Sequence, residues 1–422
     1  MPNTSAGDRH ISIDAVRGFA VLGILLMNIV GMGMPSFAYL NPTYAGGSTG
    51  ADLWTWAVNN VLTDGKMRAL FTMLFGASAA LIADRAERGD GPGPMQTHYR
   101  RLFWLFVIGM IHAYFLWFGD ILVCYAVAGL FIFPFRKLGA RVQIGIGAVI
   151  LLALLTKNVV SAEQLDALRA AATAPDASAA AIKAWQDASM AVIPPPGMKA
   201  AELAGFGGGF MEALKARANV AMLMQLVLTP TDSLPEAVGQ MFVGMGLFRM
   251  GFFTLGWTSR AYGVLIAFGY LVAAPLTAWL AWMISKSGFE PLTLHRLEAW
   301  QQASRPFIAL AHAGVLLLVI RAGTAPAVIE RLAAAGRMAF SNYLMTSIIT
   351  NLLFCGYGFG LYGKLSRFEQ LAVVLGVWAF ILIWSKPWLA RFHYGPFEWL
   401  WRSLVRWSPQ PFARREVAVA SA

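Results

Sequence analysis

Long apolar stretches recur along this chain, and they constrain its fold more than any other feature. Several contain roughly 17–25 mostly apolar residues, the length that an α-helix needs to cross a hydrocarbon core of about 30 Å. Of the 422 residues, 58% are hydrophobic and only 13% are charged, which is outside the range of ordinary soluble domains. The alternating pattern of a membrane β-barrel is absent. The sequence therefore predicts an all-α polytopic membrane protein.

We expect about ten transmembrane helices. Their approximate ranges are 13–34, 67–83, 102–118, 120–135, 140–156, 236–253, 259–284, 306–321, 337–356 and 369–386. The second is the least hydrophobic, and the Trp-rich stretch 52–62 before it is either part of that crossing or an interfacial helix. The first contains Asp14 and Arg17 and is longer than a typical signal-peptide core, which favours a retained helix over a cleaved signal.

The distribution of Lys and Arg predicts that both termini lie in the cytoplasm. With the N-terminus inside, the cytoplasmic segments hold more than twice as many Lys and Arg as the short outer loops. The net charge of +11 is spread along the flanks of the apolar segments rather than gathered in one domain or tail. This spread argues against a nucleic-acid partner and leaves the lipid bilayer as the expected one.

One long polar segment, 157–235, separates five expected spans from the other five. Its Ala-rich pieces 163–172 and 211–228 are expected to form helices, whereas 194–197 and 207–209 are expected to be Pro and Gly hinges. We therefore expect a small helical extracytoplasmic lid between helices five and six. The remaining parts are an N-terminal bundle 1–156, a C-terminal transmembrane half 236–407 and a cytoplasmic tail 408–422. The division into five and five also allows the inverted repeats of a transporter.

Ionisable side chains within the expected spans are the main functional candidates, because charges in the bilayer interior are costly and usually face a cavity or a partner. Asp14 and Arg17 lie three residues apart on one helical face and can pair, either as a charged helix end or as a site where Arg17 holds an anionic ligand group. Arg100 and Arg101 open the third span on the cytoplasmic side. They are either topological anchors or a phosphate-binding patch for a nucleotide-like donor.

A histidine and an aspartate form the best general-base candidate. His112 lies about ten residues into the third span, near or beyond the bilayer midplane, and Asp120 follows across a short outer turn. The carboxylate is expected to orient the imidazole and raise its basicity. A histidine that only forms a hydrogen bond to a neighbouring helix is the alternative.

Polar residues near the inner leaflet supply further candidates. Ser341 and Asn342 begin the ninth span, where either interhelical hydrogen bonding or substrate binding would explain them. The segment 395–402 mixes aromatic and charged residues as an interfacial helix does. Within it, Glu398 and Arg402 lie four residues apart and can pair along the helix.

The sequence lacks the motifs of several common types of site. Cys124 and Cys355 lie in hydrophobic segments without the spacing of metal ligands or of a disulfide framework, so no metal is expected. No GxSxG elbow, Walker loop or HExxH sequence occurs. The common templates of soluble enzymes therefore do not apply.

Three motifs of this chain resemble one known family over nearly the whole sequence. They are Asp14-Ala-Val-Arg17-Gly18 with its continuation to Asn28, the Gly119-Asp120-Ile-Leu hairpin preceded by His112, and Gly395-Pro-Phe-Glu398-Trp-Leu-Trp-Arg402. Together they are similar to the YeiB family, whose C-terminal half is the domain of unknown function 418. The N-terminal half of that family resembles the transmembrane acyltransferases, which include the lysosomal heparan-glucosaminide N-acetyltransferase and the bacterial acyltransferase-3 proteins.

This resemblance implies a bacterial inner-membrane enzyme that moves an acyl group from cytosolic acyl-CoA, such as acetyl-CoA, to an extracytoplasmic sugar or glycan. Asp14, Arg17, Arg100 and Arg101 would then hold the donor, and Asn28, Asn342, Glu398 and Arg402 would contact the substrate. Some relatives carry a catalytic histidine soon after the first helix, but residues 28–66 contain none, so His112 is expected to take that role.

Two hypotheses follow for the function. In the first, His112, oriented by Asp120, deprotonates an acceptor hydroxyl or is itself acylated. In the second, the chain is a transporter or a lipid-handling or envelope-handling protein that uses the same charges as a relay. A scaffold without either activity and a homodimer are also left open.

Overall fold

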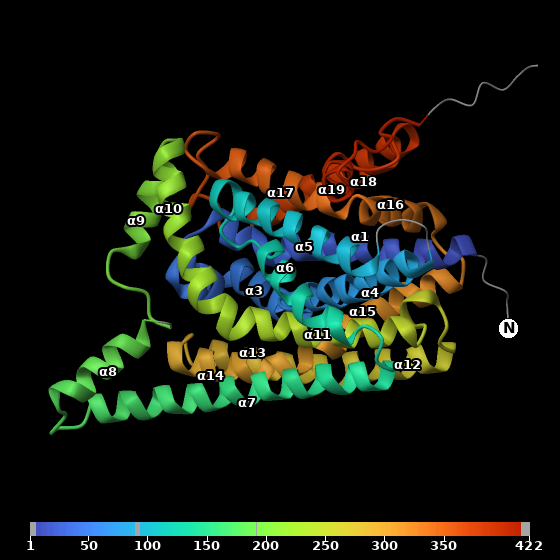
Figure 1. The fold of residues 1–422 in the computed structure, drawn as a ribbon. Helices are drawn as coiled ribbons and strands as arrows, with labels where there is room; N and C mark the ends of the chain where they lie inside the picture. The colour runs from blue at the N-terminus through green and yellow to red at the C-terminus, as the bar shows by residue number, and fades with distance from the viewer. Residues whose placement is uncertain (1–5, 89–92, 191, 415–422) are drawn as a thin grey trace, which may run out of the picture.

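The protein is a bundle of helices in a computed structural model that describes residues 6–88, 93–190 and 192–414, with side chains from residue 11 on (Figure 1). These ranges contain no β-strand, only an isolated bridge between Phe392 and Ala413. The predicted all-α class is therefore confirmed. Of the expected tail 408–422, residues 415–422 lie outside the described part.

The helices follow one another along the whole described chain. The α-helices are α1 (Ala6–Gly33), α2 (Phe37–Leu40), α3 (Gly50–Leu62), α4 (Lys66–Arg88), α5 (Pro94–Ile111), α6 (Leu122–Ile132), α7 (Ala140–Ala172), α8 (Ala179–Ser189), α9 (Met198–Gly207), α10 (Phe210–Leu223), α11 (Leu234–Arg249), α12 (Ser259–Phe268), α13 (Ala274–Lys286), α14 (Pro291–Gln301), α15 (Arg305–Arg321), α16 (Pro326–Arg337), α17 (Ala339–Phe354), α18 (Gln370–Arg391) and α19 (Pro396–Arg406). The π-helical segments are η2 (His112–Leu116), η4 (Met224–Ser233) and η6 (Gly269–Ala273), and the 3-10 turns are η1 (Pro42–Tyr44), η3 (Phe133–Phe135), η5 (Phe252–Thr254) and η7 (Gln302–Ser304).

Each expected transmembrane segment coincides with helix. The correspondence is 13–34 with α1, 67–83 with α4, 102–118 with α5 and η2, 120–135 with α6 and η3, 140–156 with α7, 236–253 with α11 and η5, 259–284 with α12, η6 and α13, 306–321 with α15, 337–356 with α17, and 369–386 with α18. Within the described residues, six segments are long and apolar enough to cross a membrane: Ile11–Gly33, Gly50–Arg88, Ala140–Ala172, Ser259–Lys286, Pro291–Arg321 and Gln370–Arg391. The count of ten crossings and their orientation stay predictions.

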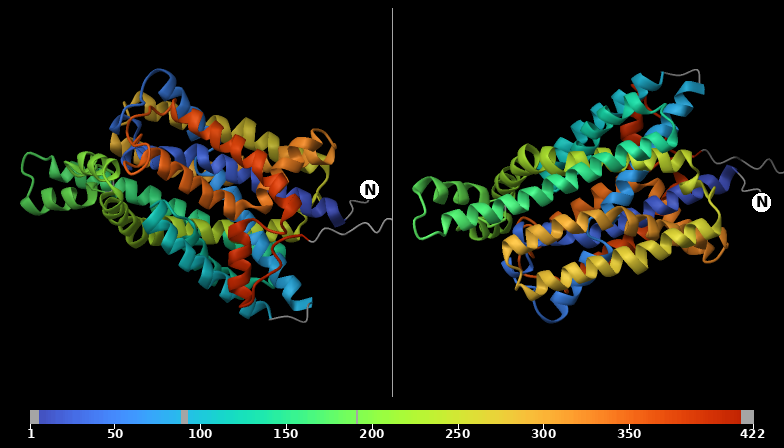
Figure 2. Two further views of the ribbon diagram at one scale, coloured as in Figure 1. Left: turned by 90° about the horizontal axis from the view of Figure 1, so that it is seen from above. Right: turned by 90° about the horizontal axis from the view of Figure 1, so that it is seen from below.

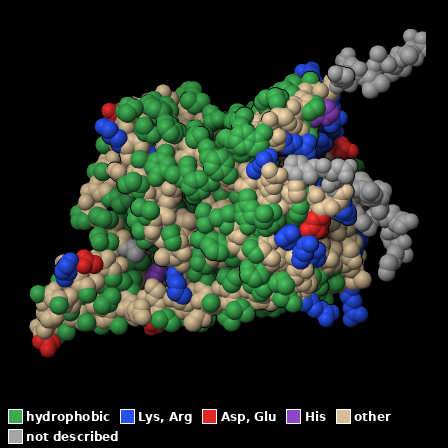
Figure 3. Space-filling view, viewed as in Figure 1, with side chains coloured by type: hydrophobic (Ala, Val, Ile, Leu, Met, Phe, Trp, Pro, Cys, Tyr) green, Lys and Arg blue, Asp and Glu red, His purple; other side chains and the backbone are tan. Residues whose placement is uncertain are grey.

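The surface of the bundle has the character expected in lipid. Figure 3 shows hydrophobic side chains spread over the middle of the molecule, with most of the visible Lys and Arg toward the end where the chain begins. The membrane-length segment of α7 is only 17% buried although it is strongly apolar, so most of its side chains face outward. Outward-facing apolar residues over such a length fit a bilayer environment and not water.

Glycines allow the central helices to approach closely. On α16, a Cβ added to Gly336 would lie 1.8 Å from the Asp14 carbonyl oxygen of α1, and one added to Gly18 would lie 2.0 Å from the Leu332 carbonyl oxygen. The helices α4 and α11 meet in the same way at Gly76. Small residues at such crossings are typical of helix packing in membranes, where backbone contact replaces the hydrophobic driving force.

The predicted lid is helical. The expected span 140–156 and the predicted Ala-rich helix 163–172 form one continuous helix, α7, because the Ala-rich sequence after the apolar stretch keeps its backbone hydrogen bonds. The helices α8, α9 and α10 follow, and the hinges predicted at 194–197 and 207–209 lie between them. These helices gather at the end of the bundle opposite the N-terminus (Figures 1 and 2). The position of that end outside the cytoplasm stays a prediction.

Candidate functional site

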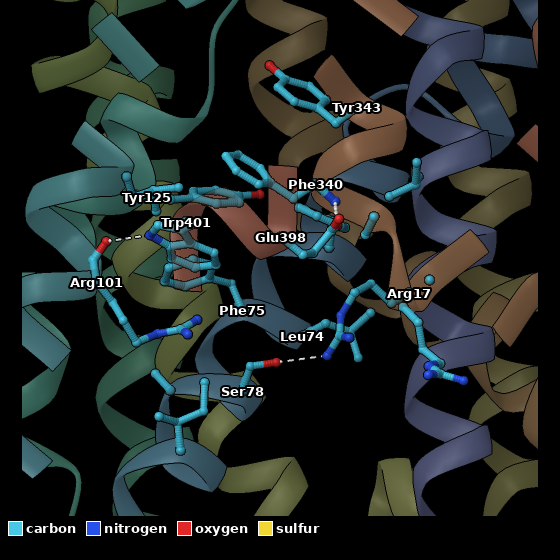
Figure 4. A pocket seen from close by; sticks show the side chains of 18 of the residues that line it. Arg17, Leu74, Phe75, Ser78, Arg101, Tyr125, Phe340, Tyr343, Glu398 and Trp401 are labelled. Atoms are coloured by element: carbon cyan, nitrogen blue, oxygen red, sulfur yellow. Dashed lines mark hydrogen bonds between the residues drawn. The ribbon is translucent and has the colours of Figure 1, made fainter. Parts of the chain in front are cut away.

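A cavity of about 380 Å³ lies within the bundle between α1, α4, α5, α6, α16, α17 and α19 (Figure 4). Its lining includes five arginines and two carboxylates: Arg17, Arg85, Arg101, Arg337, Arg402, Asp14 and Glu398. Val21 and Ile24 line it further along α1, and Tyr125 and Tyr343 also line it. The lining is therefore amphipathic and combines positive charge with apolar walls.

The contact between α1 and α16 brings part of this positive charge together. Because Gly18 and Gly336 allow backbone contact, Arg17 and Arg337 both reach the same cavity. The predicted pair of Arg17 with Asp14 is confirmed, with 3.0 Å between Nη1 and Oδ1. Nη2 of Arg17 also donates to Oγ of Ser78 at 3.0 Å (Figure 4). Two partners on different helices fix the guanidinium at the cavity wall.

The structure separates the two adjacent arginines of α5. Arg101 lines the cavity, and its guanidinium carbon lies 4.1 Å from the ring centroid of Trp401, a cation–π contact. The Trp401 indole also donates to the Arg101 carbonyl oxygen at 3.2 Å (Figure 4). Arg100 does not line the cavity and lies 5.9 Å from the Trp407 ring. Of the predicted phosphate-binding patch, the cavity contains Arg101 alone.

Glu398 of α19 caps the first turn of α17. Its Oε1 accepts hydrogen bonds from the backbone amides of Phe340, at 2.8 Å, and Ser341, at 3.0 Å, and the Ser341 hydroxyl donates to Oε2. Burial raises the pKa of this carboxyl, and the same hydrogen bonds oppose that rise. The predicted pair of Glu398 with Arg402 was wrong for the described residues, since the helix terminus takes the carboxylate. Arg402 instead lies 4.6 Å from the Tyr394 ring.

His112 and Asp120 meet as predicted, deep in the protein. Nδ1 of His112 lies 2.7 Å from Oδ2 of Asp120, and each side chain is 1% exposed. The backbone amide of Val123 donates to the other carboxylate oxygen at 2.8 Å. On the far side of the ring, Nε2 lies 2.8 Å from Oγ of Ser347 on α17. These contacts form a serine–histidine–aspartate relay.

Tyr343 separates this relay from the arginine-lined cavity. Its ring lines the cavity, and its centroid lies 4.9 Å from that of His112, whereas His112 does not line the cavity. The structure thus places Arg17 and His112 in adjoining regions and not in one space. Tyr343 and Ser347 were not among the predicted site residues, although both lie on one face of a helix at a spacing of four residues.

The two predicted substrate-binding asparagines lie outside this cavity. Asn342 is fully buried, where its amide donates to the Ala335 carbonyl oxygen at 3.0 Å and its oxygen accepts from the Trp384 indole at 2.9 Å. Asn28 is half-buried on α1. Among the described residues no cluster of His, Cys, Asp or Glu could hold a metal ion.

Comparison with known proteins identifies the family. Residues 247–408 match the family described as "Protein of unknown function (DUF418)". The chain is 32% identical to the "Uncharacterized protein YeiB" of Escherichia coli strain K12, over 94% of this chain and 96% of that protein. The chain belongs to the YeiB family. Its apolar helices and its relatives together indicate a bacterial membrane protein.

Other relatives of the YeiB family align over similar lengths. The "Uncharacterized protein YxaH" of Bacillus subtilis strain 168 is 28% identical over 98% of both chains. The "Uncharacterized 39.9 kDa protein in amylase 3'region" of Bacillus acidopullulyticus is 24% identical over 94% of both chains. No solved structure matches this chain at a significant level. The resemblance to the YeiB family is confirmed, and its relation to acyltransferases stays a prediction.

Proposed function

We propose that this protein is a membrane acyltransferase whose arginine-lined cavity binds acyl-CoA from the cytoplasmic side. The observation that carries the proposal is the amphipathic lining of the 380 Å³ cavity, with five arginines against two carboxylates among apolar walls. Arginine matches phosphate oxygens with paired hydrogen bonds, and apolar walls suit an acyl chain or a pantetheine arm. An elongated anion with an apolar end fits both regions at once.

The relay behind Tyr343 supports the chemical step. If Asp120 accepts the Nδ1 proton of His112, the Nε2 lone pair faces the Ser347 hydroxyl and can act as a general base. In the proposed reaction, the Ser347 oxygen attacks the thioester carbonyl carbon while its proton passes to Nε2. The C–S bond then breaks, and the CoA sulfur leaves with that proton. An acceptor hydroxyl then gives its proton to the same nitrogen and attacks the ester carbonyl carbon. The bond from that carbon to the Ser347 oxygen breaks, and the proton passes from Nε2 to the released Ser347 oxygen.

A direct transfer without the serine ester is the simpler form of this mechanism. In it, His112 deprotonates the acceptor hydroxyl, which attacks the thioester itself. Labelled acetyl groups retained on the denatured wild-type protein, and lost with Ser347→Ala, would identify the ester route. Transfer that survives Ser347→Ala would identify the direct route. In both forms Tyr343 has to move, because its ring lies between the cavity and the imidazole.

Two adjacent residues provide a matched test of donor binding. Acetyl-CoA is titrated into the full-length protein in detergent, comparing the wild type with Arg101→Gln and Arg100→Gln. Loss of a charged hydrogen bond of about 1.5–3 kcal/mol weakens binding roughly tenfold to a hundredfold, so Arg101→Gln should show this loss. Arg100→Gln should bind as the wild type does, because Arg100 lies outside the cavity. Equal affinities of the two variants would contradict the proposed donor site.

A second candidate function, handling of an anionic lipid, is favoured by the same apolar walls. A phospholipid could place its phosphate at Arg17 and its chains along Val21 and Ile24. The two functions differ in catalysis, because only the acyltransferase transfers acetyl groups. His112→Gln should abolish acetyl transfer to any acceptor while leaving acetyl-CoA binding intact. Absence of acetyl-CoA binding by the wild type, together with tight binding of anionic lipid, would favour the second function.

A further inference from the structure

A second, much smaller cavity lies beneath the lid at the end opposite the N-terminus. It has a volume of about 10 Å³ and is enclosed by α1, the turn after η2, α9, α10 and α17. Arg217 of α10, Asn351 of α17 and Tyr362 of the following loop are among its polar lining residues. A space of this size holds about one water-sized atom or ion.

Arg217 brings an uncompensated positive charge into this place. Its side chain is 1% exposed, and Nη2 donates to Oδ1 of Asn351 at 2.8 Å, with the Tyr357 hydroxyl at 3.5 Å and Sγ of Cys355 at 3.7 Å. All three partners are neutral, and no described carboxylate forms an ion pair with Arg217. The buried Glu202 on α9 instead accepts hydrogen bonds from the Ser36 amide and hydroxyl, each at 2.6 Å. A guanidinium stays protonated when buried, so its charge needs a counter-charge.

Two donors at this cavity also lack an acceptor. Within the described part of the chain, Nη1 of Arg217 and the hydroxyl of Tyr362 are buried without a hydrogen-bond partner. Both residues line the same small cavity, and Tyr362 is 5% exposed. Buried polar atoms are nearly always satisfied in proteins, so two orphan donors on one space indicate a ligand that accepts hydrogen bonds. The positive charge of Arg217 indicates that this ligand is an anion.

We propose that this cavity is a binding site for a small monovalent anion, held between Arg217 and Tyr362. The ligand is either a halide ion or one oxygen of a small carboxylate, which share the required charge, accept the same hydrogen bonds and each place a single atom in the cavity. The bound anion joins α10 to the loop after α17 and so holds the lid against the bundle. The backbone amide of Gly356, which donates to the Phe206 carbonyl oxygen at 2.8 Å, supports the same closed position. The site stands independently of the proposed acyl transfer.

Thermal unfolding of the full-length protein in detergent tests the site. Sodium chloride and sodium formate are titrated against sodium gluconate at constant ionic strength, because gluconate is too large for the cavity. A ligand that binds only the folded state raises the unfolding temperature with saturation, so chloride or formate should do so and gluconate should not. A response to chloride alone assigns a halide site, and a response to formate assigns a carboxylate site.

Three variants decide whether the response comes from this cavity. Arg217→Gln and Tyr362→Phe should each lower the apparent anion affinity, roughly tenfold or more for the arginine. Arg296→Gln, which removes a partly exposed arginine paired with Asp166, should respond as the wild type does. Tyr362→Phe keeps the test decisive if Arg217→Gln fails to fold. Equal effects of all three salts, or an unchanged response in both cavity variants, would overturn the proposal. Acetyl-CoA is absent throughout, so failure here is separate from failure of the proposed enzyme activity.

Discussion

The helices α1 and α16 cross in close contact at Gly336, and this contact positions part of the wall of the arginine-lined cavity. One methyl group added at residue 336 tests the contact. In Gly336→Ala the new Cβ would lie 1.8 Å from the Asp14 carbonyl oxygen and 2.7 Å from the Gly18 amide nitrogen. Both are backbone atoms and cannot rotate away. To reach 3.0 Å, below which real Cβ contacts essentially never occur, the helices must separate by about 1.2 Å. The wall that carries Arg17 then moves with α1.

The expected destabilisation follows from opposing effects. Overpacking of a tight contact costs about 1–3 kcal/mol, and obstruction by backbone favours the upper end of this range. Replacement of glycine by alanine within a helix stabilises the folded state by roughly 0.5–1 kcal/mol. The net loss should therefore be about 2 kcal/mol. Gly145→Ala on α7 is the matched control, because no atom lies within 4 Å of its added Cβ. This variant should therefore show only the stabilisation that alanine brings to a helix.

The assay is thermal unfolding of both full-length variants in one detergent, followed by intrinsic tryptophan fluorescence. Gly336→Ala should unfold several degrees below the wild type, and Gly145→Ala at or slightly above it. Acetyl-CoA affinity of the folded protein should fall in Gly336→Ala alone, since Arg17 shifts with α1. If the two variants unfold at the same temperature, the close contact between α1 and α16 is refuted, and with it this account of how the cavity is built.

Two further predictions concern buried polar groups. Burial raises the pKa of Glu202 above its ordinary value of 4.5, so the folded state binds this proton more tightly than the unfolded state. The stability of the wild type should therefore fall as pH rises from about 4.5 through the raised pKa of Glu202. In a plot of unfolding temperature against pH, Glu202→Gln should remove this fall. Parallel curves for the variant and the wild type would contradict the prediction. Asn342→Ala should destabilise the protein by about 1–3 kcal/mol, because it leaves the Trp384 indole without its acceptor. Its acetyl-CoA affinity should be unchanged, and a loss of affinity without a loss of stability would assign Asn342 to the site.

The helices of this fold could be predicted because hydrophobic length is a local property of the sequence. Each expected span coincides with helix for that reason. Hydrophobic length could not show in the same way that the span 140–156 and the predicted Ala-rich helix 163–172 are one helix, α7. The apolar stretch stops near residue 156, but a helix ends where its backbone hydrogen bonding ends, and the Ala-rich residues 163–172 continue it. Polarity marks where a helix leaves the bilayer and not where it stops.

Contacts between residues close in sequence were predictable, and contacts across the bundle were not. Asp14 with Arg17 follows from helical spacing, and His112 with Asp120 follows from a short turn. The capping of α17 by Glu398 has no local signature, since it depends on how α19 packs. That contact also explains the failed prediction for this residue. Hydrogen bonds from two backbone amides and a hydroxyl at a helix N-terminus stabilise the Glu398 carboxylate more than one exposed ion pair with Arg402 would.

The helix α17 connects the two cavities through residues spaced by four. Tyr343 lines the large cavity, Ser347 contacts His112, and Asn351 contacts Arg217 at the small cavity. Eight residues of α-helix span about 12 Å, so the large cavity, the relay and the small cavity follow one another on one helical face over that distance. The Asn351 amide also donates to the Ser347 carbonyl oxygen at 3.1 Å. An acyl group carried by Ser347 would therefore lie about one helical turn from Asn351, the residue that contacts Arg217 beneath the lid.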